Sequence, residues 1–177
     1  MGKYETDCVK MMVKEDKPPI PGKSSVLMFG QDCFPAAPNW VEMMTITGDF
    51  MMMEGTPKDA EKIVHVGPDG HKGGPYPKRI ENADKMMFFY GTDPNHTDDL
   101  GAHVEFHLGE GEDEEVLEFD EPRCVFIPRG LRHGPVYVTG HHRDFTVFTV
   151  LTTPTREAAG IITDFDYAAD EEKLNRR

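Results

Sequence analysis

The strongest structural signal in the chain is the stretch Cys124-Val125-Phe126-Ile127-Pro128-Arg129-Gly130-Leu131-Arg132-His133. An apolar run ends at a proline, turns at a glycine and leads to one histidine. Proline fixes φ and has no N–H, which suits the end of a strand, and glycine permits the tight turn that follows. The stretch therefore predicts a buried strand and a turn that delivers His133 to the space that the strand faces. A histidine there can be a metal ligand, a proton carrier, or a turn residue whose ring bonds to a neighbour.

Short apolar runs separated by Gly, Pro and Asp recur along the rest of the chain. They occupy residues 41–47, 50–53, 61–66, 86–90, 102–108, 124–127, 136–138 and 145–151. Gly48-Asp49 between the first two runs predicts a tight hairpin turn. Strong helical periodicity is absent before the C-terminal tail. This pattern predicts an all-β domain, either a β-sandwich or a small barrel.

The 177 residues are enough for one domain with a core, flanked by two short extensions. Residues 1–24 are polar and contain Pro18, Pro19 and Pro21, so we expect an extended N-terminal arm. Residues 25–153 are expected to form the β-domain. Residues 154–177 are expected to be a tail with a short helix over 167–174.

Charge and cysteine content narrow the possible partners and compartments. The formal net charge of −13 argues against nucleic acid or an anionic membrane surface as the main partner. Much of this charge lies in residues 110–121, which we expect to form a solvated hairpin. No apolar run approaches the ~20 residues of a membrane span, and no apolar signal core follows Met1. Cys8, Cys33 and Cys124 are widely spaced, as is typical of reduced thiols in a cytoplasmic protein.

Two segments resemble the cupin superfamily, in particular small single-domain bacterial cupins. One is Lys85-Met86-Met87-Phe88-Phe89-Tyr90-Gly91, and the other is the PxGxxH pattern of Pro128 to His133. The resemblance covers roughly residues 62–151. It implies a double-stranded β-helix, also called a jelly-roll barrel, that is usually dimeric. It also implies a cavity with a divalent metal bound by two histidines and a glutamate of the first motif and by the histidine of the second, here His133.

The first motif of this chain departs from the family pattern. Counting back from Gly91, the glutamate position falls on Lys85. The histidine positions fall on Arg79 and Glu81, or with a longer spacer on Lys78 and Ile80. Lysine and arginine offer no lone pair at neutral pH, and a divalent ion beside them would be repelled. The metal set that the resemblance implies cannot be transferred intact.

A relocated metal site is one way to restore the chemistry. His103, Glu105 and His107 alternate along the strand 102–108, so all three share one face. If that face pointed inward, His103 and Glu105 could join His133 in binding Zn, Mn, Fe or Ni. His65 and His71 are further candidate ligands. The alternative is that the apolar residues between them face the core and the polar trio faces outward, as is usual in a half-buried strand.

A cationic site without metal is the other way. Arg79, Glu81, Lys85 and His133 occupy the positions of the family's ligands and would line the same cavity. Glu81 could neutralise one cation, and the remaining charge would suit a carboxylate or phosphate, which arginine grips with two N–H groups. Lys85, Glu81 and His133 are then the candidate catalytic groups, since a lysine beside a second cation favours base or Schiff-base chemistry. The alternative is that Arg79 and Lys85 lie on the surface.

The functional hypothesis is a cytoplasmic homodimer that acts as an enzyme on a small anionic or oxygenated metabolite. His133 would be the proton carrier or a metal ligand, and Arg79 or Lys85 would bind the anion. The sequence does not choose a reaction. A non-catalytic, metal-free sensor or carrier is the main alternative, and a structural role is a third. Neither nucleic acid nor a membrane is expected as a partner.

Overall fold

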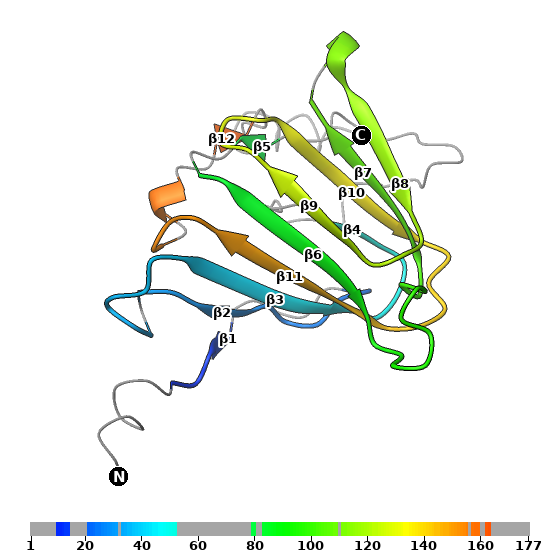
Figure 1. Cartoon of the computed structure of the whole chain (residues 1–177), viewed down its shortest axis with the longest axis horizontal. Coiled ribbons are helices and arrows are strands. Elements are labelled where there is room, and N and C mark those ends of the chain that lie inside the picture. Colours follow the sequence, from blue (N-terminus) through cyan, green and yellow to red (C-terminus); the bar gives the residue numbers. More distant parts are fainter. Residues whose placement is uncertain are drawn as a thin grey trace, which may run out of the picture.

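Two antiparallel β-sheets face each other in the computed structural model, which describes residues 10–14, 21–31, 33–52, 79–80, 83–109, 111–155, 157–159 and 162–163 (Figure 1). Sheet A contains, in spatial order, β1 (Val13–Lys14), β2 (Leu27–Phe29), β3 (Trp40–Ile46), β11 (Phe145–Leu151), β6 (Lys85–Gly91) and β9 (Arg123–Ile127). Sheet B contains β12 (Ile162–Thr163), β5 (Arg79–Ile80), β10 (His133–Thr139), β7 (His103–Leu108) and β8 (Glu115–Phe119), and β4 (Phe50–Met52) also pairs with β10. In the described part of the chain the helical elements are two 3-10 turns, η2 (Gly111–Asp113) and η3 (Glu157–Ala159).

The strands after β5 cross repeatedly between the sheets. β6 lies in sheet A, β7 and β8 in sheet B, β9 in sheet A, β10 in sheet B and β11 in sheet A. This order winds the chain as a double-stranded β-helix, so the predicted all-β fold is confirmed. Within the ranges given above, no helix has the length and apolar character needed to cross a membrane.

The core fills the space between the two sheets. Phe89 of β6 packs edge-on against Phe106 of β7 and Phe119 of β8, with ring centroids 6.2 and 5.2 Å apart. Val104 and Phe106 are fully buried, whereas Glu105 between them is not, which is the alternation of a strand with one face on the core. Tight packing across these three strands fixes their relative register and the faces that they present.

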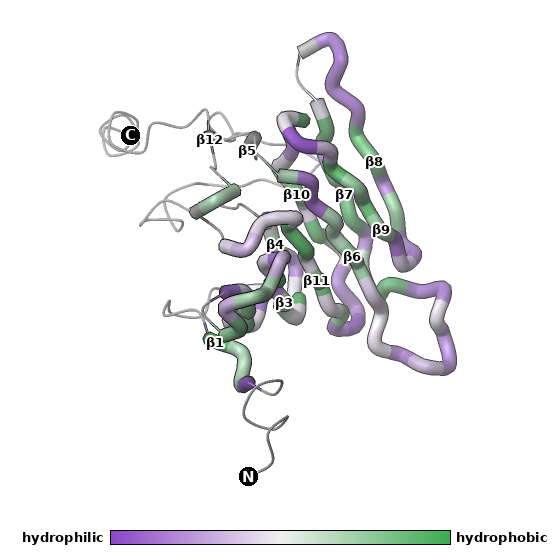
Figure 2. Tube along the Cα trace, turned by 60° about the vertical axis from the view of Figure 1, so that its left-hand side comes forward, coloured by the Kyte–Doolittle hydropathy of each residue, from purple (hydrophilic) through white to green (hydrophobic). Residues whose placement is uncertain are grey.

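Most of the predicted strands are found, but the predicted hairpin at Gly48-Asp49 was wrong. Gly48-Asp49 does not close a hairpin, because β3 before it lies in sheet A and β4 after it lies in sheet B. The chain crosses between layers at this point. The acidic segment 110–121 contains a strand, β8, that pairs with β7 and places Phe119 in the core. The other side chains of β8 are mostly exposed, and Figure 2 shows the hydrophilic connection between β7 and β8.

Other predictions fall on residues that the structure does not describe. The strand at 61–66 and the helix at 167–174 lie outside the described residues. Of the predicted N-terminal arm, β1 is described, and it pairs with β2 at the margin of sheet A.

The turn before His133 has the predicted form. Gly130 has φ +84°, a conformation that glycine adopts without steric cost, and Leu131 N donates to Pro128 O at 3.0 Å. Arg129 N donates to Asp84 Oδ1 at 2.9 Å, and Asp84 N donates to Thr152 Oγ1 at 3.1 Å. These bonds tie the turn to the residue that precedes β6. The first residues of β6 and β10 therefore lie at the same end of the barrel, the upper left in Figure 1.

Candidate functional site

His133 is the first residue of β10 and is buried, with 4% of its surface exposed. Its Nδ1 lies 3.0 Å from the carbonyl oxygen of Leu131. Because a carbonyl only accepts hydrogen bonds, Nδ1 carries the proton and donates it. In the neutral ring the lone pair is then on Nε2, which makes Nε2 the atom that can accept a proton.

Lys85 faces this lone pair from the opposite sheet. It is the first residue of β6, it is 1% exposed, and its Nζ lies 3.4 Å from His133 Nε2. An ammonium donates, so the bond runs from Lys85 to the ring nitrogen. This contact joins the two sheets across the interior of the barrel. The structure thus brings together two of the residues that the sequence singled out, and Lys85 is not on the surface.

The structure describes the backbone of Arg79, and it does not describe Glu81. The backbone of Arg79 in β5 pairs with His133 and, on its other side, with Thr163 of β12. This register puts the backbone of Arg79 beside His133 in sheet B. Glu81 lies outside the described residues, so its role stays a prediction.

The relocated metal set is not assembled among the described residues. His103, Glu105 and His107 lie on the face of β7 opposite the buried Val104 and Phe106. His133 pairs with Leu108, whose side chain packs against the core on the inner face. The outward alternative for the polar trio is therefore the observed one, because the apolar residues of β7 take the core side. His65 and His71 lie outside the described residues.

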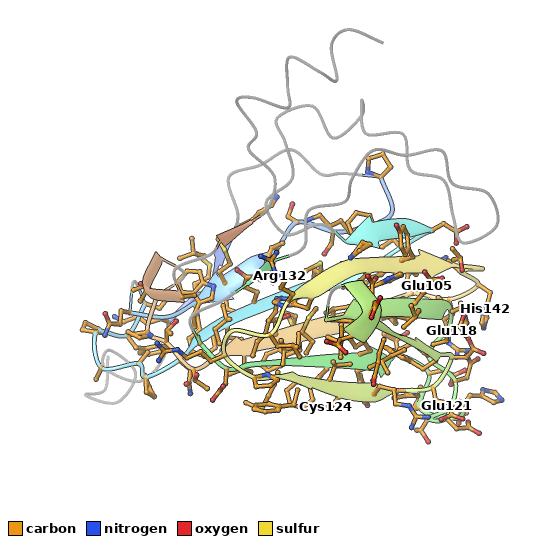
Figure 3. All side chains as sticks on the ribbon, turned by 90° about the horizontal axis from the view of Figure 1, so that it is seen from above. Glu105, Glu118, Glu121, Cys124, Arg132 and His142 are labelled. Atoms are coloured by element: carbon orange, nitrogen blue, oxygen red, sulfur yellow. The ribbon has the colours of Figure 1, made fainter. Side chains whose placement is uncertain are left out.

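Each outward imidazole of β7 is bonded to carboxylates instead. His107 Nδ1 lies 2.6 Å from Glu114 Oε1, and its Nε2 lies 2.7 Å from Glu105 Oε1. His103 Nδ1 lies 2.6 Å from Asp120 Oδ1. Glu105 stands opposite Glu118 in the strand register, and the two are seen side by side in Figure 3. These contacts form an outer ionic network that is separate from the Lys85–His133 pair.

A divalent metal does not fit the donor set seen beside His133. The facing group is an ammonium, which has no lone pair and would repel the ion. No group of three or more His, Cys, Asp or Glu side chains in the described part of the chain could hold a metal. We therefore derive no chemical step through a metal from these residues.

Two buried polar residues escaped the sequence reasoning. Glu42 of β3 and Thr149 of β11 are 4% and 1% exposed, and they stand opposite each other in the register. Trp40 Nε1 donates to Glu42 Oε1 at 3.0 Å. The two-residue alternation of the strand could have revealed Glu42. It shares a face with Trp40 and Met44, so a carboxylate stands at an inward position of an otherwise apolar face.

The opposite end of the barrel is ionic and close to solvent. There the pKa of Asp93 is held below its usual value of 3.8, mainly by a hydrogen bond from His96. The pKa of Asp99 is lowered from the same value, mainly by the backbone N–H of Gly101. Arg143 contacts both carboxylates, with Nη2 at 2.6 Å from Asp99 Oδ2. This network joins the β6–β7 and β10–β11 connections and lies away from Lys85.

Comparison with known proteins gives structural similarity only. No family model matches the chain, and no curated protein matches it by sequence. Oxalate decarboxylase from Bacillus subtilis has a TM-score of 0.52 and 7% identity, over 89% of this chain and 33% of the enzyme. A structure on the substrate binding mode of oxalate decarboxylase gives 0.51 and 6%, over 85% and 30%. An oxalate oxidase with glycolate gives 0.48 and 11%, over 87% and 61%.

The two similarities with TM-scores above 0.5 establish the fold. The chain spans less than two thirds of each of these proteins, and the identities are far below those that carry function. The fold that it shares with oxalate decarboxylase is the cupin fold, a double-stranded β-helix, as the two sequence motifs predicted.

Proposed function

We propose that this chain binds and acts on a small organic anion at the end of the barrel where Lys85 meets His133. The observation that carries the proposal is the 3.4 Å contact between Lys85 Nζ and His133 Nε2, both in the interior. A buried ammonium is costly unless charge or hydrogen bonds compensate it. An ammonium has three N–H donors, so Lys85 can donate to His133 and to a ligand carboxylate together.

The pair also offers proton transfer. His133 is held by Leu131 so that Nε2 is the basic atom, and Lys85 lies against that atom. Once a bound carboxylate draws the Lys85 ammonium away from Nε2, that atom is able to take a proton from the ligand. The ligand then carries the electron pair and the matching negative charge, and the imidazolium that forms can later return the proton. Because both groups are buried, water competes little for their hydrogen bonds. This arrangement supports an enzyme, with His133 as the proton carrier and Lys85 as the anion-binding group.

One group of structural relatives is consistent with this class of ligand. Oxalate decarboxylase acts on a small organic acid, and one of its structures is described as having Mn(II) centres. At 6% identity this similarity is one of fold. The proposal therefore rests on Lys85 and His133, and it is metal-free because an ammonium stands beside the imidazole.

Titration with small acids tests the proposal. The chain has one tryptophan, Trp40, whose indole bonds to buried Glu42, so its fluorescence can report binding at this end. We expect lactate or propionate to bind and Lys85→Met to weaken binding at least about tenfold. Lys14→Met removes an exposed lysine of β1 and should change nothing. Equal binding by the wild type and Lys85→Met would overturn the proposal.

Turnover and metal content separate the competing functions. Proton NMR of the bound acid should show conversion that is lost in His133→Asn while binding is retained. Binding without conversion of any acid would favour a sensor or carrier. Stoichiometric metal in tag-free protein that disappears in His133→Ala would contradict the metal-free site.

A further inference from the structure

The hydroxyl of Thr149 is a buried polar group with no hydrogen-bond partner in the described part of the chain. Only 1% of the residue is exposed. It stands on the inner face of β11, between Glu42 of β3 and Met87 of β6. Buried hydroxyls are almost always hydrogen-bonded, because desolvation is otherwise uncompensated. An orphaned hydroxyl here points to a bound group that supplies the missing bond.

Thr149 also lies close to the proposed anion site. Lys85 pairs with Leu151, two residues further along β11, so Thr149 is the diagonal neighbour of Lys85 on the same face. Such neighbours lie about 7–8 Å apart between backbones, a distance that long side chains and a small ligand can bridge. A ligand whose carboxylate is bound by Lys85 can therefore reach Thr149 with its next carbon substituent.

Glu42 decides which substituent suits this position. Its carboxylate is buried directly across from Thr149 and accepts the indole N–H of Trp40. A second ligand carboxylate beside Glu42 would meet a like charge at low dielectric, which is strongly unfavourable. A neutral hydroxyl would instead donate to an oxygen acceptor and accept from Thr149.

We propose that Thr149 and Glu42 form the specificity half of the site and select a small hydroxy acid with a single carboxylate. This rests on the proposed function, since Lys85 must bind the carboxylate. Thr149 contacts the ligand hydroxyl, and Glu42 excludes dicarboxylates. Both residues bind the ligand and neither takes part in proton transfer.

A matched ligand set tests this proposal. Lactate, propionate and malonate have the same carbon chain and differ in a hydroxyl or a second carboxylate. We expect the wild type to prefer lactate over propionate at least about tenfold and to bind malonate least. Thr149→Val keeps the shape of the side chain and should abolish the preference for lactate while leaving propionate unchanged. Thr149→Ser should retain the preference, and Thr146→Val, on the outer face of β11, is the matched control.

The possible failures are distinguishable. If the wild type binds none of the acids, this inference and the proposed function are both overturned. If the acids bind but Thr149→Val still prefers lactate, Thr149 does not contact the ligand while the Lys85 site stands. Malonate binding as tight as lactate binding would overturn the role of Glu42.

Discussion

Sheet A and the β7–β8 hairpin of sheet B use the same two-residue alternation with opposite results. In β7 the apolar residues face the core, and His103, Glu105 and His107 face outward to carboxylates. In sheet A the outward residues Met86 and Phe88 of β6 are apolar, whereas Lys85 of the same strand points inward. The difference shows that alternation separates two faces but does not by itself say which face is the interior.

Adjacent phenylalanines of β6 give the sharpest test of this comparison. Phe89→Ala should destabilise the chain by about 3–5 kcal/mol, because the ring is 1% exposed and packs on two other rings. Phe88→Ala, on the outer face, should cost about 1 kcal/mol in the monomer. Urea denaturation at low protein concentration measures both. Similar costs would mean that the outer face is as tightly packed as the core.

Replacing the buried Lys85–His133 pair with apolar side chains should leave the free energy of unfolding unchanged or raise it, by less than the loss of the Phe89 ring lowers it. In the double variant Lys85→Met/His133→Leu, apolar side chains of similar size replace two buried polar groups. We expect stability to be unchanged or to rise by about 1–4 kcal/mol, as when buried ion pairs are replaced. The same variant should lose anion binding. A marked loss of stability in urea denaturation would show that the pair is structural and would weaken the functional proposal.

The outward ionic network of β7 should affect stability less than the core ring of Phe89 or the Lys85–His133 pair. His107 bonds to Glu105 and Glu114 near the surface, where ion pairs are worth about 0–1 kcal/mol. His107→Gln should therefore lower the free energy of unfolding by no more than about 1 kcal/mol and leave acid binding unchanged. A changed affinity for lactate or propionate would connect this face to the site.

The smallest effect is expected at the far end of the barrel, under acid. Native pKa values of Asp93 and Asp99 lie below 3.8, so both carboxylates bind protons more weakly in the folded than in the unfolded state. Their contribution to stability is complete above the ordinary carboxyl range and is lost as pH falls through the lowered values. Asp99→Asn should flatten the fall in melting temperature below about pH 4. Asp98→Asn, an exposed neighbour, is the control, and an equal effect there would contradict the assignment.

Sequence reasoning reached much of the fold and half of the site. Short strands punctuated by glycine and proline predicted the all-β domain, and the Pro128 to His133 turn predicted where the histidine lies. The hairpin at Gly48-Asp49 failed because a tight turn looks the same whether the chain pairs with itself or crosses to another sheet. Thr149 was missed because a threonine in an apolar strand carries no sign of which side it faces.

The amino-acid sequence by itself determined the strands, the turn at Gly130, the acidic surface and the absence of the usual ligands from the first motif. These features depend on local chemistry: backbone freedom, charge and side-chain alternation. Only the tertiary structure decided that Lys85 meets His133, that His103 and Glu105 face away from them, and that Glu42 stands across from Thr149. These pairings join residues far apart in the chain, and they depend on which face of each strand the packed core takes.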